Sequence, residues 1–83
     1  ANSHRKNEAY CKAFGAHVRK LREAKGYGLR EFASIADMEY STLTDIERGV
    51  NNYTISTVLR LAENLGVTPS ELFDFRFLGK SKK

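Results

Sequence analysis

Apolar residues recur at helical spacing along most of the chain. The first set is separated by four, four and three positions and consists of Tyr10, Phe14, Val18 and Leu21. Residues three and four positions apart lie on one side of a helix. The pattern therefore predicts a helix over about residues 7–25, and Gly26 after it suits the left-handed backbone that often ends a helix.

The stretch from Gly28 to Gly49 contains two shorter apolar patterns. The first comprises Leu29, Phe32, Ala33 and Ala36, and the second comprises Leu43 and Ile46. The few residues between the patterns leave room only for a sharp corner, in which Asp37 is expected to adopt left-handed backbone. We predict one helix from about Leu29 and another over roughly 40–48. Together they form a helix-turn-helix unit (28–49), whose second helix can enter a groove of DNA.

Two further helices are expected after this unit. Thr54 is the predicted cap of a helix whose apolar face carries Ile55, Val58, Ala62 and Leu65, and Gly66 ends it. The run Thr68-Pro69-Ser70-Glu71 is a capping box with proline at the first helical position, which predicts a last helix.

Beyond the last helix, apolar and polar residues alternate through Phe73, Phe75 and Phe77. A period of two predicts a short extended segment, and Phe73 is expected in the core. The sequence thus predicts an all-α fold, a compact five-helix bundle with a central helix-turn-helix and a short extended C-terminal segment. It is expected to be a single domain over residues 1–83 with an ordered core of about 7–78.

Composition is typical of a small globular domain, with 41% apolar residues and a net charge of +4. No apolar run approaches the roughly 18 residues that a membrane span needs, and no signal peptide is visible, so a cytoplasmic location is expected. The single cysteine excludes an internal disulfide framework. The positive charge suggests an anionic partner, yet residues 27–53 carry two basic and five acidic side chains. The helix-turn-helix is therefore acidic, which opposes a simple basic-patch argument for nucleic acid.

Catalysis and metal binding find no support in the residue pattern. His4 and His17 lie thirteen positions apart, with no acidic or cysteine partner at metal spacing. There is no glycine-rich phosphate loop and no nucleophile motif. We predict that the protein is not an enzyme, uses no metal or cofactor, does not bind a membrane, and shows no evident small-molecule effector site.

Three stretches resemble the Cro/C1-type (Xre-type) helix-turn-helix regulators: FGAHVRKLREAKG, REFASIADMEYSTLTDIERG and TISTVLRLAENLGVTPSELF. They cover about residues 14–73 in register, and IERG and LAENLGV are their most specific pieces. The resemblance implies a lambda repressor-like DNA-binding domain. It also implies a homodimer that binds a palindromic operator in double-stranded DNA and regulates transcription as a repressor or controller.

The resemblance also assigns roles to residues by position. The base-facing residues would be Glu39, Tyr40, Ser41, Thr44 and Asp45. The residues near the DNA backbone would be Leu29, Arg30, Thr42, Arg48, Asn51, Asn52 and Tyr53, with Thr42 and Thr44 able to reach phosphates or bases. Arg22 and Glu47 match a pair that forms a structural salt bridge between the first and third helices.

Three residues depart from the family pattern. Leu29 stands where a glutamine often anchors a phosphate, although backbone N–H groups at a helix start can still hold one. Asp37 replaces the corner glycine, and Glu39 replaces the serine or threonine cap. Carboxylates such as Asp45 would repel phosphates, but a carboxylate can accept a hydrogen bond from the cytosine amino group.

Several alternatives stay open at this level. The polar face of the predicted third helix is either a solvated surface or a DNA-contacting one, and Asn51-Asn52-Tyr53 is either an ordinary loop or a phosphate contact. A homodimer patch is predicted at Leu59, Leu61, Phe75, Phe77 and Leu78, while Phe75 and Phe77 would otherwise cover the core of the same chain. The rival to DNA binding is a protein-interaction module with weak or no DNA binding, which the acidic charge favours.

Overall fold

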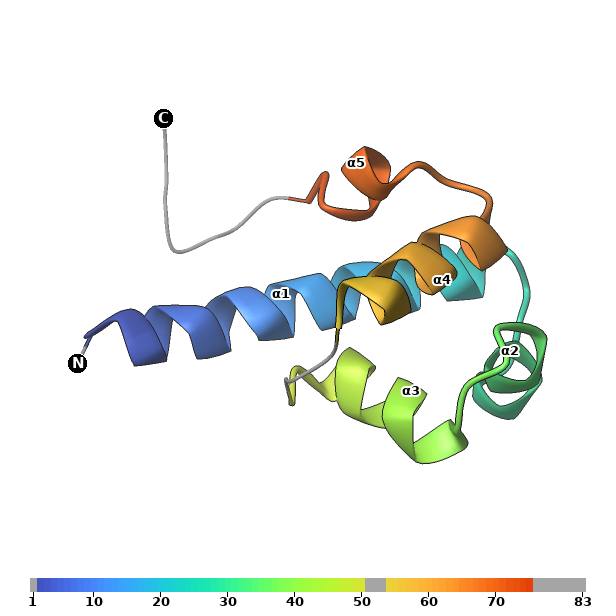
Figure 1. The fold of residues 1–83 in the computed structure, drawn as a ribbon, viewed down its shortest axis with the longest axis horizontal. Coiled ribbons are helices and arrows are strands. Elements are labelled where there is room, and N and C mark those ends of the chain that lie inside the picture. Colours follow the sequence, from blue (N-terminus) through green and yellow to red (C-terminus); the bar gives the residue numbers. More distant parts are fainter. Residues whose placement is uncertain (1, 51–53, 76–83) are drawn as a thin grey trace.

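The computed structural model describes residues 2–50 and 54–75, with side chains described from residue 8 onward. Its elements in chain order are α1 (Asn2–Ala24), α2 (Leu29–Ile35), α3 (Tyr40–Arg48), α4 (Ile55–Leu65) and α5 (Pro69–Leu72) (Figure 1). Within the described residues all regular elements are helices. The predicted all-α, five-helix architecture is confirmed.

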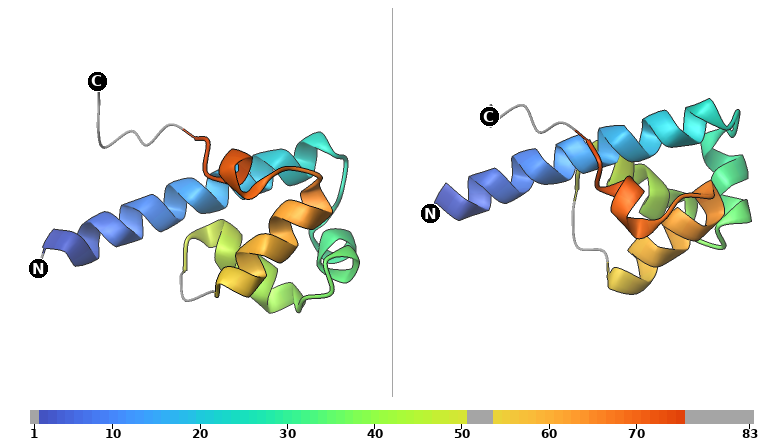
Figure 2. Two further views of the ribbon diagram at one scale, coloured as in Figure 1. Left: turned by 45° about the horizontal axis from the view of Figure 1, so that its top comes forward. Right: turned by 90° about the horizontal axis from the view of Figure 1, so that it is seen from above.

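The first helix is longer than the sequence pattern predicts. α1 begins at Asn2 rather than near residue 7, and its N-terminal part extends beyond the other helices (Figure 2). The predicted start lies shortly before Tyr10, the first residue of the apolar stripe. However, residues 2–7 contain no proline or glycine to interrupt a helix, so the backbone continues in the same conformation.

The core draws side chains from all five helices. Its largest fully buried members are Phe14, Phe32, Leu43, Ile46, Leu61, Leu65, Leu72 and Val18. α3 packs against both α1 and α2, and α4 packs against α5. The apolar faces predicted for the first three helices are therefore the faces that the fold buries, except at Tyr10, which is 41% exposed.

The buried face of α4 differs from the predicted one at two positions. Ile55 was expected inside but is 73% exposed, and Leu61 is fully buried at 0%. The core face runs from Val58 through Leu61 to Leu65, at intervals of three and four. Ile55 is the first residue of the helix, one turn before that face, and it lies past the edge of the core.

The corner between α2 and α3 has the predicted backbone. Asp37 has φ 56°, and the amide of Met38 donates to the carbonyl of Ala33 over 2.9 Å. α2 starts after Gly28, whose amide donates to Glu31 Oε1 over 3.2 Å. α3 ends at Gly49 with φ 84°, so the IERG sequence closes the helix as predicted.

The two C-terminal helices are capped by the predicted threonines. Thr54 Oγ1 accepts from the amide of Thr57 over 3.2 Å. At α5, Thr68 Oγ1 accepts from the amide of Glu71 over 3.1 Å, and the amide of Thr68 donates to Glu71 Oε1 over 2.8 Å. This reciprocal pair satisfies two amides at the helix start that have no partner within the helix.

A buried ion pair joins α1 to α3. Arg22 Nε donates to Glu47 Oε2 over 2.7 Å, and Arg22 Nη2 donates to Glu47 Oε1 over 3.0 Å. Both side chains are only 7% exposed. The hydrogen bond to Glu47 raises the pKa of Arg22, against the lowering effect of burial. Arg22 Nη1 also donates to the carbonyl of Tyr27 over 2.7 Å. This pair is the salt bridge that the family resemblance implies.

The chain after α5 folds back onto α1. The Phe75 ring lies 5.2 Å from the ring of Tyr10, 5.5 Å from His17 and 6.3 Å from Phe14, measured between centroids. Phe73 stacks on Phe14 with a centroid distance of 5.0 Å, but it is 44% exposed, so its predicted place inside the core is wrong. The amide of Phe75 donates to the carbonyl of Phe73. The rest of the predicted extended segment lies outside the described residues.

Candidate nucleic-acid interface

One side of α3 is polar and is not packed against the rest of the chain. Around the helix, the opposite side carries Leu43 and Ile46, both buried. The open side is an arc of five residues, called here the α3 face: Tyr40, Ser41, Thr44, Asp45 and Arg48. These side chains are exposed or half-buried. The helix itself lies at the outside of the bundle, where it contacts α1 and α2 (Figure 1).

Two interactions lie within the α3 face. Thr44 Oγ1 donates to the carbonyl of Tyr40 over 2.7 Å, which holds that side chain against its own helix. Arg48 Nη1 lies 3.6 Å from Asp45 Oδ1, and the two side chains are 65% and 51% exposed. An exposed pair of this kind contributes about 0–1 kcal/mol. Both side chains are therefore free to exchange this contact for a ligand, while Arg48 offsets part of the Asp45 charge.

A cation–π contact connects the starts of the two helices of the motif. The guanidinium carbon of Arg30 lies 4.2 Å from the centroid of the Tyr40 ring. Arg30 is the second residue of α2 and Tyr40 the first of α3. The exposed aromatic ring, which is 39% exposed, therefore has a partner within the protein.

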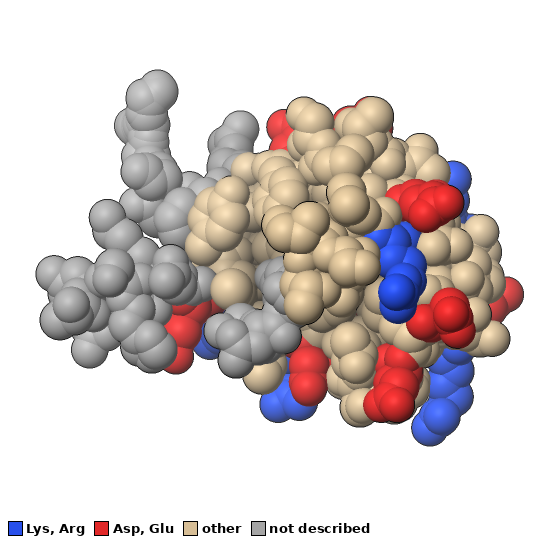
Figure 3. All heavy atoms as spheres, in the orientation of Figure 1, with Lys and Arg blue, Asp and Glu red and all other residues tan. Residues whose placement is uncertain are grey.

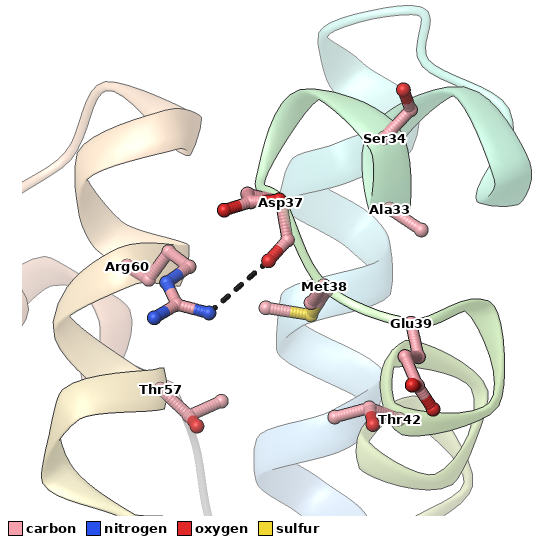
Figure 4. A pocket seen from close by; sticks show the side chains of 8 residues that line it. All are labelled: Ala33, Ser34, Asp37, Met38, Glu39, Thr42, Thr57 and Arg60. Atoms are coloured by element: carbon pink, nitrogen blue, oxygen red, sulfur yellow. Dashed lines mark hydrogen bonds between the residues drawn. The ribbon is translucent and has the colours of Figure 1, made fainter.

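Thr42 lies apart from the α3 face. It lines a cleft of about 530 Å³ between the α2–α3 corner and α4 (Figure 4). Across this cleft, Arg60 of α4 donates to the carbonyl of Asp37 over 3.2 Å. Glu39 also borders the cleft, next to the start of α3. Glu39 and Thr42 are both predicted DNA contacts. They thus border a second surface, which faces α4.

A smaller cleft of about 240 Å³ adjoins the opposite edge of the α3 face. It is lined by Leu29 at the start of α2, by Thr44 and Arg48 of α3, and by Arg19 of α1. The family resemblance assigns no role to Arg19. One sequence signal does place Arg19 near α3. It lies three positions before Arg22, so the two residues share a side of the helix, and Arg22 is expected to contact α3.

Charges of both signs are interspersed around the motif. In the view of Figure 3, acidic and basic side chains alternate over α3 and the α2–α3 corner. Residues 27–53 carry two basic and five acidic side chains. The predicted DNA-backbone contacts Asn51, Asn52 and Tyr53 lie outside the described residues.

The described residues hold no cluster of histidine, cysteine, aspartate and glutamate that could bind a metal ion. Among them, no helix has the length and apolarity that crossing a bilayer requires.

The predicted dimer patch is only partly available. Leu61 is fully buried, so its inclusion was wrong; it belongs to the core face of α4. Phe75 is half-buried against α1 of the same chain. Leu59 is 49% exposed, and Ile55 lies one turn before it on the same side of α4. Phe77 and Leu78 lie outside the described residues.

Comparison with known proteins places this geometry in a family. The helix-turn-helix family model HTH_3 matches residues 18–72. The control protein C.BamHI of Bacillus amyloliquefaciens is 32% identical over 71 residues, covering 84% of this chain and 88% of its own.

Two solved structures extend the likeness. The crystal structure of the restriction-modification controller protein C.AhdI from Aeromonas hydrophila superposes with a TM-score of 0.72 at 34% identity, covering 75% of this chain and 94% of that one. The biofilm master regulator SinR, crystallised in complex with DNA, superposes with a TM-score of 0.69 at 32% identity, covering 74% and 98%. The chain belongs to the HTH_3 family of Cro/C1-type helix-turn-helix proteins.

Proposed function

We propose that this protein binds double-stranded DNA sequence-specifically and regulates transcription, with the α3 face in the major groove. The observation that carries the proposal is the open polar arc of α3, supported from behind by Leu43 and Ile46. In helix-turn-helix proteins the second helix lies in the major groove, and its N-terminal residues contact base edges. The similarity to C.BamHI and C.AhdI favours a controller of the restriction–modification type.

Sequence preference would come from the α3 face. The Ser41 hydroxyl is exposed and can donate to or accept from a base edge, and Asp45 can accept from a cytosine amino group. Thr44 contributes more through its methyl group, because its hydroxyl donates to the carbonyl of Tyr40. Glu39, at the start of the helix, also remains among the proposed base contacts.

Affinity would come from phosphate contacts beside this face. Arg19 and Arg48 flank the smaller cleft beside the start of α2, and among the described residues each pairs with an exposed carboxylate. The amides at the start of α2 can bind a phosphate beside Leu29. Asn51, Asn52 and Tyr53 remain proposed backbone contacts. Residues 1–26, which carry seven basic and two acidic side chains, offset the acidic motif.

A salt titration tests DNA binding against the rival role as a protein-interaction module. Specific binding is expected to weaken with salt, with a log–log slope of roughly −0.9 per phosphate contact. Arg19→Ala should weaken binding to all duplexes and reduce the slope by about one contact. Ser41→Ala should instead narrow the difference between preferred and unrelated duplexes. Equal loss on every duplex from Ser41→Ala would contradict the base-contact role, and no binding to any duplex at low ionic strength would favour the rival.

A homodimer on a palindromic operator is the second part of the proposal. Two copies related by a two-fold axis would present their α3 helices about 34 Å apart, one turn of DNA. Such an axis needs a self-complementary surface. Ile55 and Leu59, exposed on one side of α4, supply apolar area for it in place of Leu61.

Leu59→Glu is expected to shift the protein towards the monomer, because it places a charge in this apolar surface. Sedimentation velocity at several concentrations measures the shift. Ala16→Glu is the matched control, since it adds the same charge to an exposed residue of another helix, α1, and should leave the dimer intact. A dimer that persists unchanged in Leu59→Glu would place the interface elsewhere.

A further inference from the structure

The contact between Arg30 and Tyr40 places an arginine beside the first residue of α3. The guanidinium carbon lies 4.2 Å from the ring centroid, within the range in which a cation is attracted to the face of an aromatic ring. Within the described part of the chain, Arg30 makes no ion pair with a carboxylate and no hydrogen bond. Its N–H donors are therefore available to a ligand while the stack restrains its position.

The stack places the Arg30 guanidinium at the start of α3 as well as at the start of its own helix, α2. Arg30 belongs to α2, whose start was expected near the DNA backbone, but its partner Tyr40 is the first residue of α3. The ring therefore holds the guanidinium at the N-terminal end of the helix proposed to enter the groove. Recognition helices contact base edges mainly from this end. Arg30 is exposed and Tyr40 is 39% exposed, so a duplex can reach both.

We infer that Tyr40 is a positioning residue that holds Arg30 for hydrogen bonding to a guanine in the major groove. Two N–H groups of Arg30 would donate to guanine O6 and N7, the bidentate pairing that the planar guanidinium fits. This inference rests on the proposed DNA binding. It replaces the phosphate contact that the family resemblance implies for Arg30, and the direct base contact that it implies for Tyr40.

Restraint of the guanidinium favours guanine over phosphate as the target. A phosphate contact depends chiefly on charge and tolerates many orientations, and an unrestrained arginine or lysine provides it. A bidentate contact to a base edge requires a guanidinium in one place and one plane. An arginine held by a ring loses less conformational freedom when it makes that contact.

The test begins with selection of preferred duplexes from a random pool by the wild-type protein. Affinities are then measured for Arg30→Ala, Tyr40→Leu, Tyr40→Phe and the Arg30→Ala/Tyr40→Leu double variant, on duplexes with each base pair changed in turn. Arg30→Ala and Tyr40→Leu are expected to lose preference for the same guanine, by roughly 5- to 100-fold. The double variant should lose no more than either single one. Tyr40→Phe should retain the preference, because the ring face remains.

Two further measurements sharpen the assignment. Replacing that guanine with 7-deazaguanine removes N7, and it should weaken binding by the wild type but not by Arg30→Ala. Arg19→Ala is the matched control, because it removes a nearby positive charge that has no described ring partner, and it should leave the preference unchanged. Thermal unfolding of each variant checks that the fold is retained, as expected for exposed side chains.

Other outcomes would overturn the inference in distinguishable ways. If Arg30→Ala weakens all duplexes equally and reduces the salt slope by about one contact, Arg30 binds phosphate. If Arg30→Ala and Tyr40→Leu affect different base pairs, Tyr40 contacts a base of its own. If the wild type selects no duplex at all, the proposed DNA binding fails and this inference with it.

Discussion

Replacing Glu47 with alanine is expected to lower the free energy of unfolding by about 3–5 kcal/mol, because it removes the hydrogen-bonded carboxylate partner of the buried Arg22 guanidinium. The two side chains form two hydrogen bonds between α1 and α3 and are each 7% exposed. Arg22 would keep only its hydrogen bond to the carbonyl of Tyr27 and a 3.9 Å contact with exposed Glu23. Chemical denaturation measures the loss as a fall in the midpoint.

Two variants separate this effect from a general cost of losing an ion pair. Asp45→Ala removes the carboxylate that pairs with Arg48, where the side chains are 51% and 65% exposed. It should change stability by no more than about 1 kcal/mol. Arg22→Met combined with Glu47→Leu removes both charges together and should be less destabilising than Glu47→Ala. A Glu47→Ala protein as stable as Asp45→Ala would show that the pair does not hold α3 to α1.

Local signals explain why most elements could be predicted. The corner at Asp37, the end of α3 at Gly49 and the capping box at Thr68 each depend on a few neighbouring residues whose chemistry restricts the backbone. The family resemblance added the Arg22–Glu47 pair, whose partners lie 25 residues apart. Spacing alone gives no reason to join two such distant residues.

The misassignments share a cause, which is that periodicity gives the side of a helix but not the boundary of the core. Ile55 and Leu61 are both apolar residues of α4, and only the position of the neighbouring helices decides that Leu61 is buried and Ile55 exposed. The same limit applies to Phe75, which packs on Tyr10 and His17 from the other end of the chain. The residues of the α3 face were predictable because an exposed arc follows directly from the helix period.

The remaining features of the site depend on contacts between helices. The Arg30–Tyr40 stack and the approach of Arg19 to the α3 face both require the angle at which the helices meet. The close approach of α1 to α3 at Gly15 belongs to the same group. In the sequence Gly15 interrupts an otherwise helical pattern with no evident reason.

Gly15→Ala is expected to destabilise the protein and to displace the recognition helix. A Cβ at this position would lie 2.7 Å from the carbonyl oxygen of Glu47 and closer still to that of Ile46. Both obstacles are backbone atoms of α3, so no side-chain rotation relieves the overlap. Alanine favours a helix over glycine by about 1 kcal/mol. Overpacking of this kind costs about 1–3 kcal/mol or more, and with rigid backbone as the obstacle the cost should exceed the gain.

The displacement should be visible in DNA binding as well as in stability. Moving α3 away from α1 strains the Arg22–Glu47 pair and shifts the α3 face relative to Arg19, so DNA affinity should fall along with the denaturation midpoint. Ala16→Ser is the matched control, since it adds one heavy atom at the next, exposed position of α1 and should cost no more than about 0.5 kcal/mol. If Gly15→Ala instead raised the denaturation midpoint, as the helix propensity of alanine alone would, α1 and α3 could not approach as closely as described. The recognition helix, α3, would then have to be supported by α2 alone.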